Sequence, residues 1–169
     1  MTEPTETAED YTGLFSAFGY AFRQSGSRLF RLYAVASALL GVFLTVLILS
    51  ALVKWLANPV GLVGERAFLG VISLLLLAPL FGPVLLVARH HRRTGHDGRY
   101  DRLLALAGFL FVLSLYVGLV VTVPPVYQTP PGGALGPVVA FLYGLPQLVG
   151  LVPPVVGAAL ILVAHRLGR

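Results

Sequence analysis

Four long segments without a charged side chain constrain the fold of this chain more than any other feature. They cover roughly residues 32–53, 67–88, 103–123 and 138–165. A helix needs roughly 20 apolar residues to cross the hydrocarbon core of a bilayer, and each segment meets that length. Only 11% of all residues are charged, which is too few to cover a water-soluble domain. The sequence therefore predicts an all-α integral membrane protein with four transmembrane helices.

The residues before the first segment predict two further parts. Residues 1–10 are polar and acidic, which predicts a disordered N-terminus. This start is unlike the basic start of a cleavable signal, so the first span is expected to act as an uncleaved anchor. Residues 11–27 predict a short amphipathic helix that lies in the membrane interface; packing on the cytoplasmic end of the bundle is the alternative, and the two arrangements are compatible. Its apolar stripe is Tyr11, Leu14, Phe15, Phe18 and Phe22. Residues 28–169 then form the transmembrane domain.

The basic residues predict the orientation in the membrane. Ten arginines lie before the first span, between the second and third spans, or after the fourth, whereas Lys54 and Arg66 are the basic residues of the opposite side. Lys and Arg accumulate on the cytoplasmic side, so both termini are expected to be cytoplasmic, in a multi-pass protein of the cell membrane. The arginine-rich composition suggests a prokaryotic source. This flanking charge gives no reason to expect nucleic-acid binding.

The most polar stretch is ARHHRRTGHDGRYDR, residues 88–102. A metal site could draw on its histidines and acids, but neighbouring histidines on a helix point about 100° apart and the arginines repel cations. The chain also has no cysteine. We therefore expect no metal, no cofactor and no catalytic residue, although a lipid-headgroup enzyme using His90, His91, His96, Asp97 and Asp101 remains an alternative. The stretch predicts a cytoplasmic hairpin loop whose arginines contact anionic lipid headgroups: Arg89, Arg92, Arg93, Arg99 and Arg102.

Small residues recur every four positions in two of the spans. Ser37, Gly41 and Thr45 form one stripe, and Ser114, Gly118 and Thr122 form another. Such stripes let helices approach closely and add hydrogen bonds between helices. They predict tight packing within the bundle, with a binding groove or a homodimer face as the alternative.

The last apolar region is too long for one straight span and contains Pro146, Pro153 and Pro154. A single kinked helix is favoured, and the alternative is a short piece over 138–145 followed by a span near 147–165. Tyr143 and Gln147 are the most polar pair at membrane depth and form a candidate ligand site.

No ionisable residue lies in the interior of any predicted span, and such residues usually mark transport or proteolytic sites. The sequence therefore predicts a non-enzymatic structural or accessory protein that packs with membrane lipids and with another membrane protein or a second copy. A small oligomeric transporter or channel, with its polar site near the fourth span, is the alternative.

Overall fold

The computed structural model describes residues 13–57, 63–95, 97–129 and 131–168, and within these ranges it is helical without any strand. Four of the described helices are long and apolar enough to cross a membrane, which confirms the predicted fold class. The elements in chain order are α1 (Leu14–Gln24), α2 (Arg28–Ala57), α3 (Val63–Thr94), α4 (Gly98–Val121), η1 (Pro125–Tyr127), α5 (Gly136–Tyr143), η2 (Gln147–Leu151) and α6 (Val152–Leu167).

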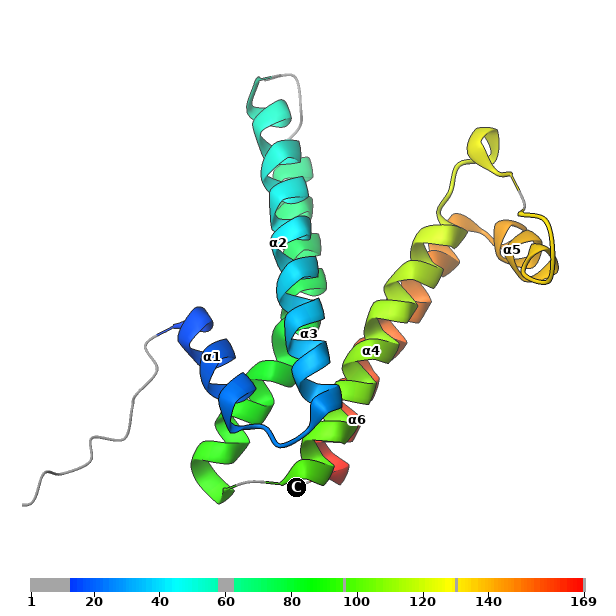
Figure 1. Ribbon diagram of the computed structural model, residues 1–169. Helices are drawn as coiled ribbons and strands as arrows, with labels where there is room; N and C mark the ends of the chain where they lie inside the picture. Colours follow the sequence, from blue (N-terminus) through cyan, green and yellow to red (C-terminus); the bar gives the residue numbers. More distant parts are fainter. Residues whose placement is uncertain (1–12, 58–62, 96, 130, 169) are drawn as a thin grey trace, which may run out of the picture.

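The long helices form two hairpins arranged as a V (Figure 1). Helix α2 runs beside α3, and α4 runs beside α6 over most of its length. The hairpins meet at the end that holds the α3–α4 connection and the C-terminus, and they diverge toward the other end (Figure 1). We call the end where they meet the vertex. Helix α3 changes direction in its middle, where Pro79 and Pro83 interrupt its hydrogen bonds, as proline in a helix interior does.

The vertex contains the packed core of the protein. Tyr33 of α2 is fully buried there, and its hydroxyl donates a hydrogen bond of 2.6 Å to the carbonyl of Leu80 in α3. Its ring packs edge-on against Phe109 of α4, with 5.2 Å between the ring centroids. Gly108 leaves the space for that ring, because a Cβ at this position would overlap the Tyr33 side chain. One aromatic residue thus joins three of the four spans.

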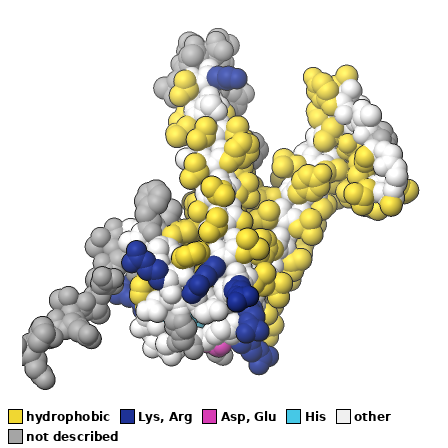
Figure 2. Space-filling model, viewed as in Figure 1, with side chains coloured by type: hydrophobic (Ala, Val, Ile, Leu, Met, Phe, Trp, Pro, Cys, Tyr) yellow, Lys and Arg dark blue, Asp and Glu magenta, His cyan; other side chains and the backbone are white. Residues whose placement is uncertain are grey.

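Beyond the vertex, the arms of the V expose apolar side chains along their length. Leu39 and Leu49 of α2, Leu119 of α4 and Val155 of α6 are all exposed. Figure 2 shows hydrophobic atoms covering both arms and the notch between them. Apolar surface of this extent needs a hydrocarbon or protein environment, so the molecule is a membrane protein.

Helix α1 packs on the vertex. Ala17 and Ala21 are buried against the bundle, and the ring of Phe18 meets Phe81 of α3 edge-on at 5.4 Å. The predicted helix over 11–27 ends at Gln24, and residues 25–27 connect it to α2. Packing on the bundle is thus present in the structure, and the position in the membrane interface, which is compatible with it, stays a prediction. The predicted disordered segment 1–10 and Tyr11 lie outside the described residues.

The fourth apolar region differs from the favoured prediction. The prediction of one kinked helix over 138–165 is wrong. The region contains α5, a break at Gly144–Pro146, the short helix η2 and then α6. The part that can span a membrane is Gln147–Leu167. Proline has no backbone N–H to donate, and Pro146 lies directly before η2. The alternative, a short piece followed by a span near 147–165, describes the chain correctly.

Candidate functional site

The predicted loop over 88–102 is mostly helical. Helix α3 continues to Thr94 and α4 begins at Gly98, so only residues 95–97 connect them. Asp97 starts α4 by accepting hydrogen bonds from the backbone N–H groups of Arg99, at 2.9 Å, and Tyr100, at 3.3 Å. These two N–H groups lower the pKa of Asp97. His91 lies in the last turn of α3 and Asp101 in the first turn of α4, and both side chains are buried in the vertex.

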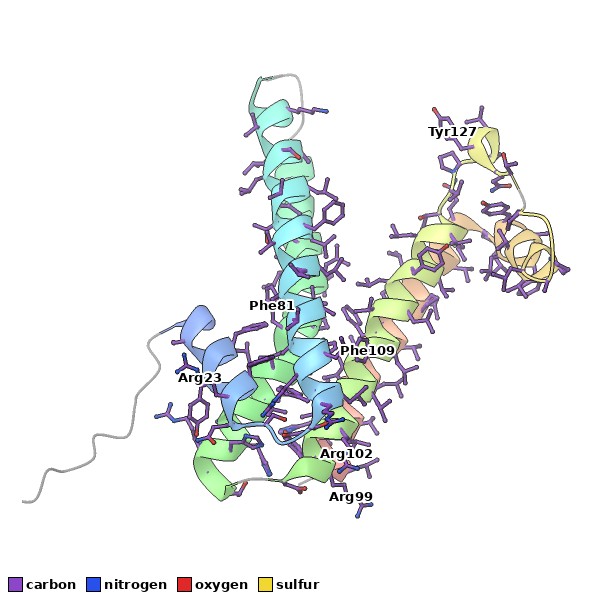
Figure 3. All side chains as sticks on the ribbon, viewed as in Figure 1. Arg23, Phe81, Arg99, Arg102, Phe109 and Tyr127 are labelled. Carbon is purple, nitrogen blue, oxygen red and sulfur yellow. The ribbon has the colours of Figure 1, made fainter. Side chains whose placement is uncertain are left out.

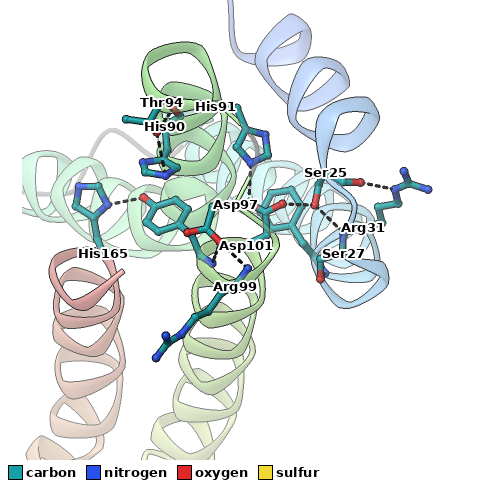
Figure 4. Close-up of polar contacts among 12 residues, drawn as sticks. Ser25, Ser27, Arg31, His90, His91, Thr94, Asp97, Arg99, Asp101 and His165 are labelled. Carbon is teal, nitrogen blue, oxygen red and sulfur yellow. Dashed lines mark hydrogen bonds and ion pairs between the residues drawn. The ribbon is translucent and has the colours of Figure 1, made fainter. Parts of the chain in front are cut away.

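His91 and Asp101 form a buried pair. The His91 Nε2 atom lies 2.9 Å from Asp101 Oδ1, and the side chains are 1% and 0% exposed. The second carboxylate oxygen, Oδ2, accepts a hydrogen bond of 2.5 Å from the hydroxyl of Ser25 (Figure 4). Burying an acid is costly unless it is paired and hydrogen-bonded, and here both oxygens have partners. The three side chains join α3, α4 and the connection between α1 and α2.

A second set of contacts holds Ser25 in place. Its hydroxyl oxygen accepts a hydrogen bond from the backbone N–H of Ser27, at 3.2 Å, and its carbonyl accepts one from Arg31 Nε, at 3.0 Å. The Ser27 hydroxyl in turn accepts from the backbone N–H of Phe30 at 3.3 Å. Serine at this position caps the start of a helix, so Ser27 begins α2 while Ser25 engages Asp101.

The order of these three groups is unlike that of a nucleophilic triad. In such a triad the histidine lies between serine and the acid and takes the serine proton. Here Asp101 lies between Ser25 and His91, so the serine donates to a carboxylate. All three residues are also buried. The arrangement is a buried hydrogen-bond network that joins helices, and we call these three residues, Ser25, His91 and Asp101, the latch.

Two further histidines meet at Tyr100, on the other side of the α3 end. The ring of His90 stacks on the Tyr100 ring, with 4.0 Å between centroids and 28° between planes. The Tyr100 hydroxyl lies 2.5 Å from Nδ1 of His165, near the end of α6. Thr94 Oγ1 lies 3.1 Å from His90 Nε2.

A cavity of about 330 Å³ opens beside this group. Its lining residues are Leu86, Arg89, His90, Arg93, Thr94 and His165. The first five recur at steps of one, three or four along α3, so they lie on one helical face. The cavity therefore combines a continuous basic face of α3 with the end of α6.

The structure separates the five arginines that were predicted to contact lipid headgroups. Arg89, Arg92 and Arg93 are all exposed on α3, and of these Arg89 and Arg93 line the cavity whereas Arg92 lies outside its lining. Arg99 and Arg102 lie on the first turns of α4 and point away from the bundle (Figure 3). All five remain at the vertex end of the molecule, where most of the dark-blue side chains in Figure 2 lie.

The two small-residue stripes lie in two different helix pairs. Gly41 faces the ring of Phe81 in α3, and Gly41 and Thr45 also line an apolar cavity of about 410 Å³. Gly118 packs against the backbone of Gly150, and Ser114 packs against Gly157. Each stripe thus holds one hairpin together.

The predicted hydrogen bonds between helices are wrong for these stripes. The hydroxyls of Ser37, Thr45, Ser114 and Thr122 each donate to a carbonyl three or four residues earlier in their own helix. Backbone carbonyls one turn back are the nearest acceptors for such short side chains. Close approach therefore comes from the glycines and not from the hydroxyls.

The candidate ligand pair Tyr143 and Gln147 is divided between two elements. Tyr143 ends α5 and is half-buried, whereas Gln147 begins η2 and is exposed. The chain at these two positions lies at the far end of the α4–α6 arm, away from the vertex (Figure 1). In the part of the chain that the structure describes, no three His, Asp or Glu side chains are grouped as metal ligands.

Sequence reasoning missed Ser25, which lies 76 positions before Asp101. It also missed the burial of His91 and Asp101. Both residues lie outside the predicted spans 67–88 and 103–123, so both were expected in an exposed loop. Had residues 86–94 been predicted as helical, the helical period would have placed the cavity-lining residues on one face of the helix and His91 outside that face.

The comparison with known proteins concerns the whole chain. Residues 1–169 match the family model described as Domain of unknown function (DUF8056). The chain belongs to this family. No curated protein and no solved structure matches it. The geometry of the vertex and of the two arms is therefore the basis for proposing a function.

Proposed function

We propose that this DUF8056 member is a non-enzymatic accessory protein of the cytoplasmic membrane, whose two hairpins hold a transmembrane helix of a partner protein or of a second copy. The observation that carries this proposal is the apolar opening between the arms (Figure 2). The vertex is closed by packed aromatic rings and by the latch of Ser25, His91 and Asp101. The open part of the molecule offers apolar surface for helix packing.

The helical period identifies the surface that lines the opening. Gly108 and Phe109 face Tyr33 at the vertex. Leu119 lies 11 positions beyond Gly108, which is about three turns along the same face of α4. Leu119 is 67% exposed. Leu113 is 57% exposed but points about 120° away from Leu119 around the helix, so it faces outward.

A pair of photo-crosslinking variants tests this proposal in native membranes. A photoreactive residue at Leu119 is expected to give one defined protein adduct, because the opening holds a partner helix. The same residue at Leu113 is the matched control and is expected to label lipid. A doubled mass at Leu119 would identify a second copy, and another mass would identify a partner. Lipid labelling alone at both positions would overturn the proposal, and solute flux through the purified protein in liposomes would favour the transporter alternative.

We further propose that the vertex and both termini face the cytoplasm. The support is the concentration of arginines at the vertex, because basic residues remain on the cytoplasmic side. The chain has no cysteine, so single cysteines can report the orientation. Gly132→Cys is expected to react with an impermeant thiol reagent added outside intact cells. Gly98→Cys is expected to react only after permeabilisation, and the reverse pattern would place the vertex outside.

A further inference from the structure

The cavity beside Tyr100 has an unbalanced positive charge. Arg89 and Arg93 lie one turn apart on α3 and both line it, and no acidic side chain is among its lining residues. The two acids that the structure describes at this end of the molecule have other partners. Asp101 is engaged by His91 and Ser25 inside the vertex. Asp97 caps α4 and attracts His90 from outside the lining. Among the described residues no acid balances these two guanidinium groups, so this wall of the cavity suits an anionic ligand.

The aromatic and hydroxyl side chains around the cavity are held in place before any ligand arrives. Tyr100 stacks on His90 and contacts Nδ1 of His165, so it positions both imidazole rings. Thr94 donates its one hydroxyl proton to the carbonyl of His90, one turn back, at 3.0 Å, so it helps to fix this wall of the cavity and is not itself a donor to a ligand. Donors from two helices and at least two kinds of side chain thus converge on one space. Pre-positioned donors reduce the entropy lost on binding.

The size and chemistry of the cavity fit a phosphate group. Arginine forms two parallel hydrogen bonds with phosphate oxygens, and an imidazole N–H can add a further donor. The remaining lining residue, Leu86, lies one turn nearer the membrane on the same face of α3. A ligand that is anionic at one end and apolar at the other would contact both parts of the cavity.

We propose that this cavity binds the phosphate of an anionic phospholipid headgroup at the membrane surface. A soluble phosphate would satisfy the same donors but would not use Leu86 or the adjoining apolar surface of the span. The proposal differs from the general attraction of five arginines to lipid, because it assigns binding to Arg89 and Arg93 and not to Arg99 and Arg102. It is also independent of whether the arms hold a partner.

Two double variants with the same net charge separate a defined site from general attraction. Arg89→Ala/Arg93→Ala removes the cavity arginines, and Arg99→Ala/Arg102→Ala removes two equally exposed arginines outside the cavity, at the start of α4. The purified proteins are titrated with phosphatidylglycerol, phosphatidylcholine or inorganic phosphate, and bound lipid is counted by native mass spectrometry. The wild type is expected to retain one phosphatidylglycerol more strongly than phosphatidylcholine. The cavity variant is expected to bind it at least about tenfold more weakly, since charge-assisted hydrogen bonds are lost, and the control variant is expected to bind it within about twofold of wild type.

Three results would overturn the proposal. Equal weakening in both double variants would show general charge attraction, which depends on net charge and not on position. Equal binding of phosphatidylglycerol and phosphatidylcholine would show that the anionic headgroup is not recognised. Inorganic phosphate that displaces phosphatidylglycerol at equal concentration would assign the site to a soluble phosphate ligand instead. A circular dichroism spectrum that matches wild type establishes that each variant is folded.

Discussion

Replacing Asp101 by alanine is expected to lower the free energy of unfolding by about 3 kcal/mol. The substitution removes both hydrogen bonds of the latch, and it leaves the Ser25 hydroxyl and His91 Nε2 buried without the acid that each now contacts. Each unsatisfied buried polar group costs about 1–3 kcal/mol. Equilibrium unfolding in mixed detergent micelles, followed by far-UV circular dichroism, measures the change.

Asp97 supplies the matched control for this experiment. It lies one turn before Asp101 and is partly exposed, and its side chain bonds only to backbone N–H groups of the first turn of α4. Asp97→Ala is therefore expected to cost about 1 kcal/mol, as for loss of a helix cap. A double-mutant cycle with Ser25→Ala should give a coupling free energy within the range of about 0.5–3 kcal/mol. Equal effects of Asp97→Ala and Asp101→Ala, or a coupling near zero, would contradict the latch.

Replacing Gly118 by alanine is expected to destabilise the α4–α6 hairpin by about 1–3 kcal/mol. A Cβ at this position would lie 2.5 Å from the carbonyl oxygen of Gly150 and 3.1 Å from Cγ of Pro154. Neither atom can move away as a flexible side chain could, because one is backbone and the other belongs to a proline ring. The helices would therefore have to separate, and unfolding in the same micelles would report the loss.

Gly70 in α3 is the control for the close approach at Gly118. A Cβ there would meet nothing within 4 Å. Gly70→Ala should therefore stabilise the protein by up to about 1 kcal/mol, because alanine has the higher helix propensity. A destabilisation at Gly70 equal to that at Gly118 would mean that small side chains are needed throughout the helices and that the Gly150 contact is not special.

The four spans could be predicted because the physical requirement for crossing a membrane is local. An uncharged apolar run of sufficient length satisfies it without knowledge of the rest of the chain. The ends of the helices could not be predicted in the same way. Hydrophobicity falls at Arg89, but the α3 helix continues to Thr94, because arginine and histidine remain good enough helix formers outside the hydrocarbon.

The candidate site depended on contacts between distant parts of the chain. Ser25, His91 and Asp101 come from three elements, and no local pattern shows that they meet. The division of the last apolar region was equally unclear, because prolines permit both a kinked helix and a break. Which one occurs depends on the packing of Gly150 and Gly157 against α4.

The divergence of the two hairpins gives the protein a different cross-section in each leaflet of the bilayer. The vertex occupies a compact area in one leaflet, and the separated arms occupy a wider area in the other (Figure 1). Hydrocarbon leaves no void, so the space between the arms is filled either by acyl chains or by protein. If acyl chains fill this space, the protein has the shape of a wedge and favours membrane that is convex on the side of the arms. If a partner helix fills it, the assembly is closer to a cylinder and loses that preference for curvature.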